Sequence, residues 1–467
     1  MEYMNSLNIK KLSLLFFLGA LFMTSCSEKI DVNSIDESKY QSSESTLAFI
    51  SDKYGNSVAD SLNFADKDST NLYIELSQTA IDNVSFSLTY DAKALNDYNT
   101  AHGTSFKAMP EALVSITGNV AISKGGSKSA AALVKYRTAN ELDSLGTYVI
   151  PVSAKVASGS VSLSETKSQF LLFVKDISKL PNCHKSTGIK IISCMEVNDT
   201  NPLNNLCFTL KKSGKPLIDM VILFSGNINF DSQTGRVYNY NNGNIQHLLD
   251  YKEKYLKPLQ DRGIKVILGI LGNHDRSGVA NLSTEAAKQF AQDLKSVCDA
   301  YNLDGVFFDD EYSSYQTPVP PGFVSPSSAA ASRLCYETKK AMPNKLVTVY
   351  VYSTTSSLPD VDGHKSGEFV DYGIHDYGGS TDLSSNYPGM PKSGMALYSQ
   401  EFSRGYYASS NSLKALRNNG YGAHMIFAMD PNSSNFYGSQ LPAMQNIANI
   451  LFDDELVYDG KPYSKDW

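Results

Sequence analysis

The stretch Leu303-Asp-Gly-Val-Phe-Phe-Asp-Asp-Glu-Tyr312 joins an apolar strand to three consecutive acids. Val306–Phe308 predicts a buried strand, and side-chain alternation places Asp309 and Glu311 on one face and Asp310 on the other. Two neighbouring carboxyls at the end of an apolar strand compete for ionisation, so we expect one to hold its proton at neutral pH. A protonated acid beside a charged one suits cleavage of a glycosidic bond. The plainer alternative is a strand that runs into an acidic turn.

The composition indicates a globular chain with more than one domain. Its 467 residues are more than one hydrophobic core usually holds. A content of 42% hydrophobic and 19% charged residues is typical of folded proteins. The formal net charge of −7, without a basic cluster, argues against nucleic acid as a partner. The chain has 28 Tyr and 21 Phe but one Trp, Trp467, so a platform for sugar rings must be built mainly from Tyr and Phe.

The six cysteines form no recognisable framework. Their spacing gives neither a zinc-binding CxxC pattern nor an obvious disulfide set. Apart from Cys26, which belongs to the N-terminal signal described below, an odd five remain. We expect buried free thiols, with one disulfide as the alternative. The five cysteines are Cys183, Cys194, Cys207, Cys298 and Cys335.

The N-terminal residues have the pattern of a secretory signal. Two lysines precede the apolar run Leu12–Met23, which is too short to span a bilayer comfortably as a permanent helix. The Thr-Ser-Cys26 that follows resembles the bacterial lipobox, so we expect residues 1–25 to be removed and Cys26 to receive lipid. An ordinary signal peptide is the alternative. Residues 26–45 predict a polar tether, and the chain is expected to be an exported lipoprotein of the outer membrane, on its cell-surface or periplasmic side.

Residues 46–178 follow the period-two pattern of strands. Leu72–Leu76 and Val84–Tyr90 each alternate apolar with more polar residues, and turn signals separate such segments. This pattern predicts an antiparallel β-sandwich, with one helix inserted near Ala92–His102. The region contains no catalytic constellation. Its expected role is a spacer or an accessory glycan-binding domain.

Beyond a boundary near Asp176–Pro181, strands alternate with helices. Residues 184–467 contain eight apolar strands with polar residues at their carboxyl ends, which predicts a (β/α)8 barrel with its site at that face. The predicted strands are Ile189–Val197, Leu217–Phe224, Val266–Leu271, the acidic strand, Leu346–Tyr352, Tyr372–Tyr377, Met395–Ser399 and His424–Met429.

Helical patterns follow some of these strands but not all. Ser353–Asp371 and Gly378–Gly394 are rich in Ser, Gly and Pro, so the helices after strands five and six are predicted to be reduced or missing. Their loss would leave one flank of the barrel open to a bulky ligand. The predicted helices are Ile245–Gln260, a helix capped by Ser283 that runs to Tyr301, Ser327–Ala341 and Leu441–Phe452.

The motif Asp304-Gly305-x-x-x-Asp309-x-Glu311 resembles the signature of family 18 glycoside hydrolases. Its Asp-Asp-Glu-Tyr ending is similar to the endo-β-N-acetylglucosaminidases of the F and H types. Asn227-Ile-Asn229, Gly263-Ile-Lys-Val266 and Leu271-Gly-Asn-His274 stand in the order of that branch. The resemblance covers most of residues 190–467 and looks closest to the F type. The sandwich resembles the domains that precede glycosidase modules in bacterial surface lipoproteins.

The resemblance implies a substrate-assisted, retaining hydrolysis. In that mechanism the N-acetyl group of the substrate attacks the anomeric carbon and forms an oxazolinium ion. Glu311 would protonate the leaving oxygen and then activate water. Asp309 would hold the acetamide N–H and offset the developing positive charge, and the Tyr377 hydroxyl would contact the acetamide carbonyl. The wider family has an Asp where this chain has Phe307, so Asp309 lacks an inner proton partner.

Other residues of the resemblance have less specific roles. Asp304 and Gly305 are expected to be structural. His375 is expected to bind substrate, with a core histidine as the alternative, whereas Asn227 and Asn273 could bind sugar hydroxyls or cap turns. The residues expected to line the sugar site are Tyr350, Phe427 and Asp430. No catalytic metal or cofactor is expected, because metal-ligand spacing is absent around His247, His364 and His424.

The expected function is an endo-β-N-acetylglucosaminidase that cleaves the GlcNAc-β1,4-GlcNAc core of Asn-linked high-mannose or hybrid glycans. The expected partners are this glycoprotein substrate and a membrane lipid, and the chain is expected to be a monomer. A chitinase is one alternative, disfavoured because Trp is nearly absent. A non-catalytic glycan-binding lipoprotein is another, disfavoured because Asp309, Glu311 and Tyr377 are all present.

Overall fold

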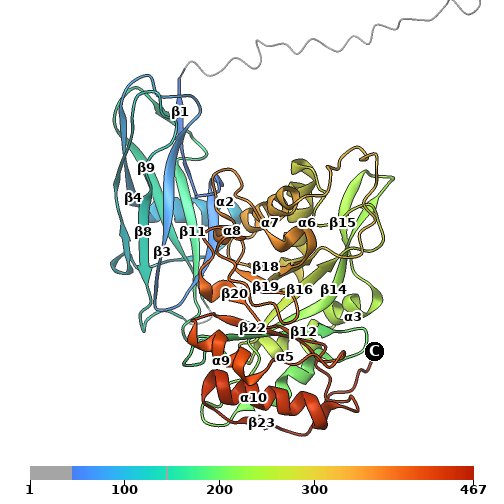
Figure 1. Cartoon of the computed structure of the whole chain (residues 1–467). Coiled ribbons are helices and arrows are strands. Elements are labelled where there is room, and N and C mark those ends of the chain that lie inside the picture. The colour runs from blue at the N-terminus through green and yellow to red at the C-terminus, as the bar shows by residue number, and fades with distance from the viewer. Residues whose placement is uncertain (1–44, 144–145) are drawn as a thin grey trace, which may run out of the picture.

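The structure is a computed structural model that describes residues 45–143 and 146–467 (Figure 1). The predicted signal peptide, Cys26 and the predicted tether up to residue 44 lie outside the described residues. Within the two described ranges, no helix has both the length and the apolar content needed to cross a bilayer.

The N-terminal domain is a two-sheet β-sandwich that lies beside a barrel (Figure 1). One sheet has the order β10-β1-β3-β8-β6 and the other β2-β11-β9-β4-β7, with β5 beside β9. The strands are β1 Leu47–Ser51, β2 Ala59–Phe64, β3 Lys67–Leu76, β4 Val84–Tyr90, β5 Lys107–Ala108, β6 Val114–Ile116, β7 Asn119–Ile122, β8 Ala132–Arg137, β9 Thr147–Ser158, β10 Ser162–Leu163 and β11 Gln169–Asp176.

The predicted alternation in the sandwich is confirmed. Leu72, Ile74, Phe86 and Leu88 are buried between the sheets. Six strand pairs of the sandwich are antiparallel, as predicted, but β1–β10, β2–β11 and β5–β9 pair in parallel. These partners are distant in the chain, and no hairpin forces them to run in opposite directions. The inserted helix α2 spans Ala92–His102, as predicted.

The C-terminal domain is a closed barrel of eight parallel strands. Its order is β12-β14-β16-β17-β18-β19-β20-β22, and β22 pairs with β12 to close it. The strands are β12 Lys190–Glu196, β14 Met220–Asp231, β16 Lys265–Leu271, β17 Gly305–Asp309, β18 Leu346–Val351, β19 Tyr372–His375, β20 Met395–Ala396 and β22 Ala423–Phe427. The barrel fold predicted from the sequence is confirmed.

Most strands differ from their predicted extents by one or two residues at an end, and two strands differ more. The seventh is split into β20 and β21 (Gln400–Glu401), both paired with β22, because Tyr398 adopts a left-handed conformation with φ of 55°. The second, β14, continues past the predicted end at Phe224 to Asp231. There it forms a hairpin with β15 (Arg236–Tyr240).

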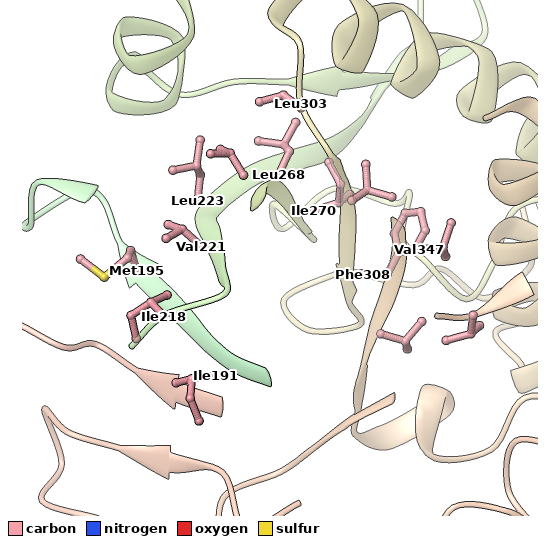
Figure 2. Packing of buried hydrophobic residues seen from close by; sticks show 14 of the residues in the cluster. Ile191, Met195, Ile218, Val221, Leu223, Leu268, Ile270, Leu303, Phe308 and Val347 are labelled. Carbon is pink, nitrogen blue, oxygen red and sulfur yellow. The ribbon is translucent and has the colours of Figure 1, made fainter. Parts of the chain in front are cut away.

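The barrel strands bury side chains on both faces. On β17, Val306 and Phe308 pack outward against the helices, whereas Phe307 faces the interior beside residues of the other strands. Figure 2 shows part of the outer layer, in which Phe308 lies close to Val347 of the next strand. The alternation predicted for the acidic strand is therefore confirmed, and it carries Asp309 to the interior face.

The helices around the barrel match most of the prediction. Ser283 caps α6 (Thr284–Tyr301) by accepting a hydrogen bond from the backbone N–H of Ala286 at 3.3 Å. Helices α7 (Ser328–Ala341) and α10 (Leu441–Phe452) lie where predicted, and α9 spans Ser410–Asn418.

The predicted helix Ile245–Gln260 is wrong as a single element. The structure has three short helices, α3 Gly243–Asp250, α4 Lys252–Tyr255 and α5 Lys257–Gln260. Pro258 lacks a backbone N–H and favours the first turn of a new helix, which explains the break before α5.

The helices predicted to be reduced are confirmed as such. After β18 the chain forms only a 3₁₀ turn, Ser353–Ser356, and the four-residue α8, Ser366–Phe369. After β19 it forms a single 3₁₀ turn, Lys392–Gly394. The five cysteines of the described residues are all buried and free, as predicted.

A turn of the sandwich docks on the flank that has lost a helix. Tyr54 is 4% exposed, and its ring lies 5.9 Å from Tyr336 of α7 and 5.6 Å from His364, which precedes α8. Asn56 Nδ2 donates a hydrogen bond to the carbonyl of Lys340 at 3.3 Å. The sandwich therefore supplies part of the outer packing of the barrel.

Truncation of the Tyr54 side chain should lower the stability of the whole protein. Tyr54→Ala is expected to lower the free energy of unfolding by about 3 kcal/mol, because a buried ring leaves a cavity between the domains. Chemical denaturation followed by near-UV circular dichroism measures it. Tyr54→Phe is the matched control and should be close to neutral, since the Tyr54 hydroxyl is buried without a hydrogen-bond partner among the described residues. A strictly additive Tyr54→Ala, Tyr336→Ala double mutant would contradict the docking contact.

Candidate active site

A cavity of about 610 Å³ lies at the carboxyl ends of the barrel strands. Side chains from the ends of β12, β14, β17, β18 and β22 line it, together with loops that follow β19, β21 and β22. Six predicted site residues are among them, namely Asp309, Glu311, Tyr350, Tyr377, Phe427 and Asp430. The barrel thus brings together residues that are up to 121 positions apart in sequence, from 309 to 430.

Asp309 is a buried acid in the cavity wall with an unused oxygen. Asp309 is 4% exposed, and its Oδ1 has no hydrogen-bond partner among the described residues. Burial raises the pKa of Asp309 well above its ordinary range, and the negative charges of Glu311, Asp310 and Asp376 raise it further. Both causes favour the neutral form of the Asp309 carboxyl over its charged form.

Glu311 is half-buried two residues further along the same face. Burial is the main cause that raises its pKa, Asp376 adds to it, and Arg404 opposes it. The backbone N–H of Gly272 donates to the Glu311 carbonyl at 3.0 Å. A Cβ at Gly272 would lie 2.3 Å from that carbonyl, so only glycine allows the loop after β16 to hold the Glu311 backbone this closely.

Asp310 points away from the cavity, as alternation predicts. It is 8% exposed, and its two carboxylate oxygens accept hydrogen bonds from Tyr315 Oη and Thr354 Oγ1. These partners lie in the loops after β17 and β18. The middle acid of the motif therefore ties two loops together, while its neighbours on either side face the cavity.

Two tyrosines continue the cavity wall next to Asp309, because β18, which carries Tyr350, pairs with β17, and Tyr377 follows the next strand, β19. Tyr350 Oη donates to Asp376 Oδ1 at 2.5 Å, and the Tyr350 and Tyr377 rings have centroids 6.2 Å apart. Burial raises the pKa of both phenols, so both keep their protons at neutral pH. Phe427 packs against Phe224 edge to face with centroids 5.6 Å apart, and it presents an apolar ring to the cavity.

Three residues predicted to bind substrate, His375, Asn227 and Asn273, do not line this cavity. Tyr372 and Ile374 belong to the barrel interior, so alternation along β19 directs His375 to the outer face, against Gly379. Burial lowers the pKa of His375.

The two asparagines cap turns, which was the alternative interpretation. Asn227 Nδ2 donates to the carbonyls of Leu271 and Gly272 at 3.3 and 3.2 Å, at the end of β16. Asn273 Nδ2 donates to Asn229 Oδ1 at 3.2 Å. Both therefore fix the loops around the site.

Asp304 and Gly305 fit closely against the strands on either side of β17. Asp304 accepts hydrogen bonds from Lys265 Nζ and from the backbone N–H of Val266, both at 2.9 Å, which ties the start of β17 to β16. A Cβ at Gly305 would lie 2.2 Å from the Leu346 carbonyl, so the neighbouring strand leaves room only for glycine.

Solved structures with the same overall fold include two of EndoBT-3987 from Bacteroides thetaiotamicron. One, with Man5GlcNAc product, is 35% identical with a TM-score of 0.67. The other, in complex with Man9GlcNAc2Asn substrate, is 34% identical with a TM-score of 0.65. Each match covers 89% of this chain and 99% of the solved chain.

Among curated proteins, endo-β-N-acetylglucosaminidase F1 of Elizabethkingia meningoseptica is 68% identical over 281 residues, which cover 60% of this chain and 83% of that protein. This chain belongs to the endo-β-N-acetylglucosaminidases. It is therefore a glycoside hydrolase. A further endo-β-N-acetylglucosaminidase, from Flavobacterium sp. (strain SK1022), is 30% identical over 274 residues, covering 58% of this chain and 83% of that protein. A family model for an N-terminal domain matches residues 40–161.

Sequence reasoning missed several cavity residues of this endo-β-N-acetylglucosaminidase. Glu196 ends β12, and its position after an apolar strand was a usable signal. Ser403 and Arg404 come from a turn after β21, held by the buried Glu401 carboxylate, which accepts from their backbone N–H groups at 2.9 and 2.6 Å. Nothing in the local pattern marks that turn. Among the residues that the structure describes, no group of three metal-ligating side chains occurs.

Proposed function

We propose that this endo-β-N-acetylglucosaminidase hydrolyses the GlcNAc-β1,4-GlcNAc core of Asn-linked high-mannose or hybrid glycans. The observation that carries the proposal is the unused Oδ1 of Asp309, buried in the cavity two residues before Glu311. A buried acceptor requires a donor, and the N–H of a 2-acetamido group is a neutral donor that a GlcNAc residue brings. The Man5GlcNAc and Man9GlcNAc2Asn complexes of the Bacteroides relative support this class of glycan.

The proposed reaction is that of a retaining family 18 glycosidase. Glu311 donates its proton to the glycosidic oxygen while the acetamide carbonyl of the substrate attacks the anomeric carbon, which breaks the glycosidic bond and forms an oxazolinium ion. As substrate binds, Asp309 releases its proton to solvent, and its carboxylate then accepts the acetamide N–H and stabilises the positive charge, while Tyr377 donates to the carbonyl oxygen. Glu311 then takes a proton from water, whose oxygen opens the oxazolinium ring and restores the starting configuration.

The shape of the barrel fits a branched substrate. The reduced helices after β18 and β19 leave room on that flank, and the sandwich turn at Tyr54 fills part of it. Phe427, held edge to face by Phe224, offers a stacking surface for a sugar ring in place of Trp. Asp430 and Glu196 supply acceptors for sugar hydroxyls around it.

Mass spectrometry of a high-mannose glycoprotein tests the proposal. Release of the glycan with one GlcNAc left on Asn supports it, and an intact glycan after exposure to wild-type enzyme rejects it. Glu311→Gln protein, prepared in parallel, controls for contaminating glycosidases. Chitin oligomers cut faster than glycoprotein would indicate a chitinase, and glycan binding without cleavage by wild type would indicate a binding protein.

We also propose that the mature chain is a monomeric lipoprotein of the outer membrane, anchored through Cys26. The lipobox-like sequence before Cys26 supports this proposal. Cys26→Ser is expected to move the enzyme from the membrane fraction to the soluble extract and to abolish labelling by a radioactive or alkyne-tagged fatty acid. Membrane association and labelling that survive the substitution would contradict it. Light scattering of the purified protein tests the monomer.

A further inference from the structure

Asp376 has no part in the mechanism above, although it lies between two candidate site residues. It follows β19 directly, and its Oδ1 accepts one hydrogen bond from Tyr350 Oη at 2.5 Å and another from the backbone N–H of Tyr377 at 2.6 Å. Both tyrosines line the cavity, whereas Asp376 does not. One carboxylate oxygen therefore holds two parts of the cavity wall in a fixed relation.

The same carboxylate acts on both motif acids. After burial, Asp376 is the next cause that raises the pKa of Glu311, and it is one of three carboxylates that raise the pKa of Asp309. Arg404 opposes it at Glu311, and Asp310 adds to it from the other face of β17. The remaining titratable groups that lie beside Asp376 or act on its two tyrosines are Cys194, His375 and Glu401.

We propose that Asp376 is a positioning residue, which orients Tyr350 and Tyr377 and places a fixed negative charge beside Glu311. This inference rests on the proposed function, because it gives Asp376 a part in the same reaction. A general acid is most effective when it remains protonated near the operating pH. The negative charge of Asp376 keeps Glu311 protonated to higher pH. Because Tyr377 is already held in place, its hydroxyl can contact the acetamide carbonyl without moving first.

Two substitutions separate the charge from the hydrogen bonds. Asp376→Asn keeps an oxygen that accepts both hydrogen bonds and removes the charge. We expect its profile of kcat/KM against pH to move by about one unit toward acid, because ionised Glu311 is no longer opposed. Tyr350→Phe removes one hydrogen bond and keeps the charge, so kcat should fall while the alkaline limb stays in place. Asp82→Asn, on the exposed surface of the sandwich, controls for the loss of one charge.

A titration that needs no turnover complements the kinetics. Glutamate labelled with ¹³C at the side-chain carboxyl reports the pKa of Glu311 by NMR, with the resonance identified by its loss in Glu311→Gln. The pKa should fall in Asp376→Asn and not in Asp82→Asn. Asp376→Ser, which also removes the charge, serves if the first variant fails to fold.

The outcomes for Asp376 and for the proposed function can be told apart. An enzyme that cleaves glycoprotein, but whose pH profile and Glu311 titration are both unmoved by Asp376→Asn, overturns the role of Asp376. A folded wild type that leaves the glycan intact rejects the proposed function, and the NMR titration still decides whether Asp376 sets the charge of Glu311.

Discussion

Replacing Glu311 with Gln is expected to lower kcat by about three orders of magnitude, because the amide can neither protonate the leaving oxygen nor take a proton from water. The substitution preserves the shape of the side chain, so KM should change little. Initial rates of glycan release from a high-mannose glycoprotein, followed by mass spectrometry, measure both constants.

Asp310→Asn is the matched control for this experiment. It removes one charge from the neighbouring position of the same motif, but the Asp310 carboxylate faces Tyr315 and Thr354 and not the cavity. Asp310→Asn should therefore affect thermal stability more than kcat. A Glu311→Gln enzyme that retains more than about a tenth of the wild-type rate would contradict the acid–base role of Glu311.

Asp309→Asn is expected to lower kcat by about two to three orders of magnitude and to change KM much less. The charge of Asp309 matters most when positive charge develops on the acetamide, which happens in the transition state and not in the bound substrate. Separate determination of kcat and KM decides the point. A variant with a changed KM and a wild-type kcat would show that Asp309 only binds.

The same substitution is expected to stabilise the fold at neutral pH. Burial raises the pKa of Asp309 above that of the unfolded chain, so the folded state holds a proton that the unfolded state releases. This contribution to stability is fully present below the unfolded pKa of about 4 and is lost as pH rises through the folded pKa. Asn avoids the loss, so the gain in free energy of unfolding over wild type should be near zero at about pH 3 and should grow as pH rises toward 7. A gain independent of pH would contradict burial of the charge as its cause.

Strand periodicity was sufficient to predict the centre of the site. The apolar run before Asp309 identified a barrel strand, and alternation correctly separated Asp309 and Glu311 from Asp310. These features depend on residues that are adjacent in sequence and on the regular geometry of a strand, which a single sequence encodes directly.

The errors occurred where that regularity ends. His375 and Tyr377 were both assigned to substrate contacts from the family resemblance, but β19 ends at His375. Tyr377 belongs to the following loop, which turns its ring into the cavity while His375 stays outside. Likewise, the left-handed Tyr398 and the proline of α5 interrupt elements that appeared continuous in the sequence.

Residues that reach the cavity from loops left no local signal. Arg404 depends on the buried Glu401 that holds its turn, and Asp376, which lies outside the cavity, depends on a tyrosine 26 positions earlier. Such pairings are set by the closed barrel, which brings neighbouring strands together across long sequence separations. They become visible only once the strand order is known.

The buried thiols have a consequence for handling this enzyme. Burial raises the pKa of Cys183 to about 11 and of Cys207 and Cys298 to about 12, so little reactive thiolate exists in the folded protein at neutral pH. Alkylating reagents and oxygen should therefore react slowly with these thiols until the protein unfolds. The rate of maleimide incorporation then reports the rate at which the barrel opens. Reaction at Cys194, which lines the cavity, would report opening of the cavity itself.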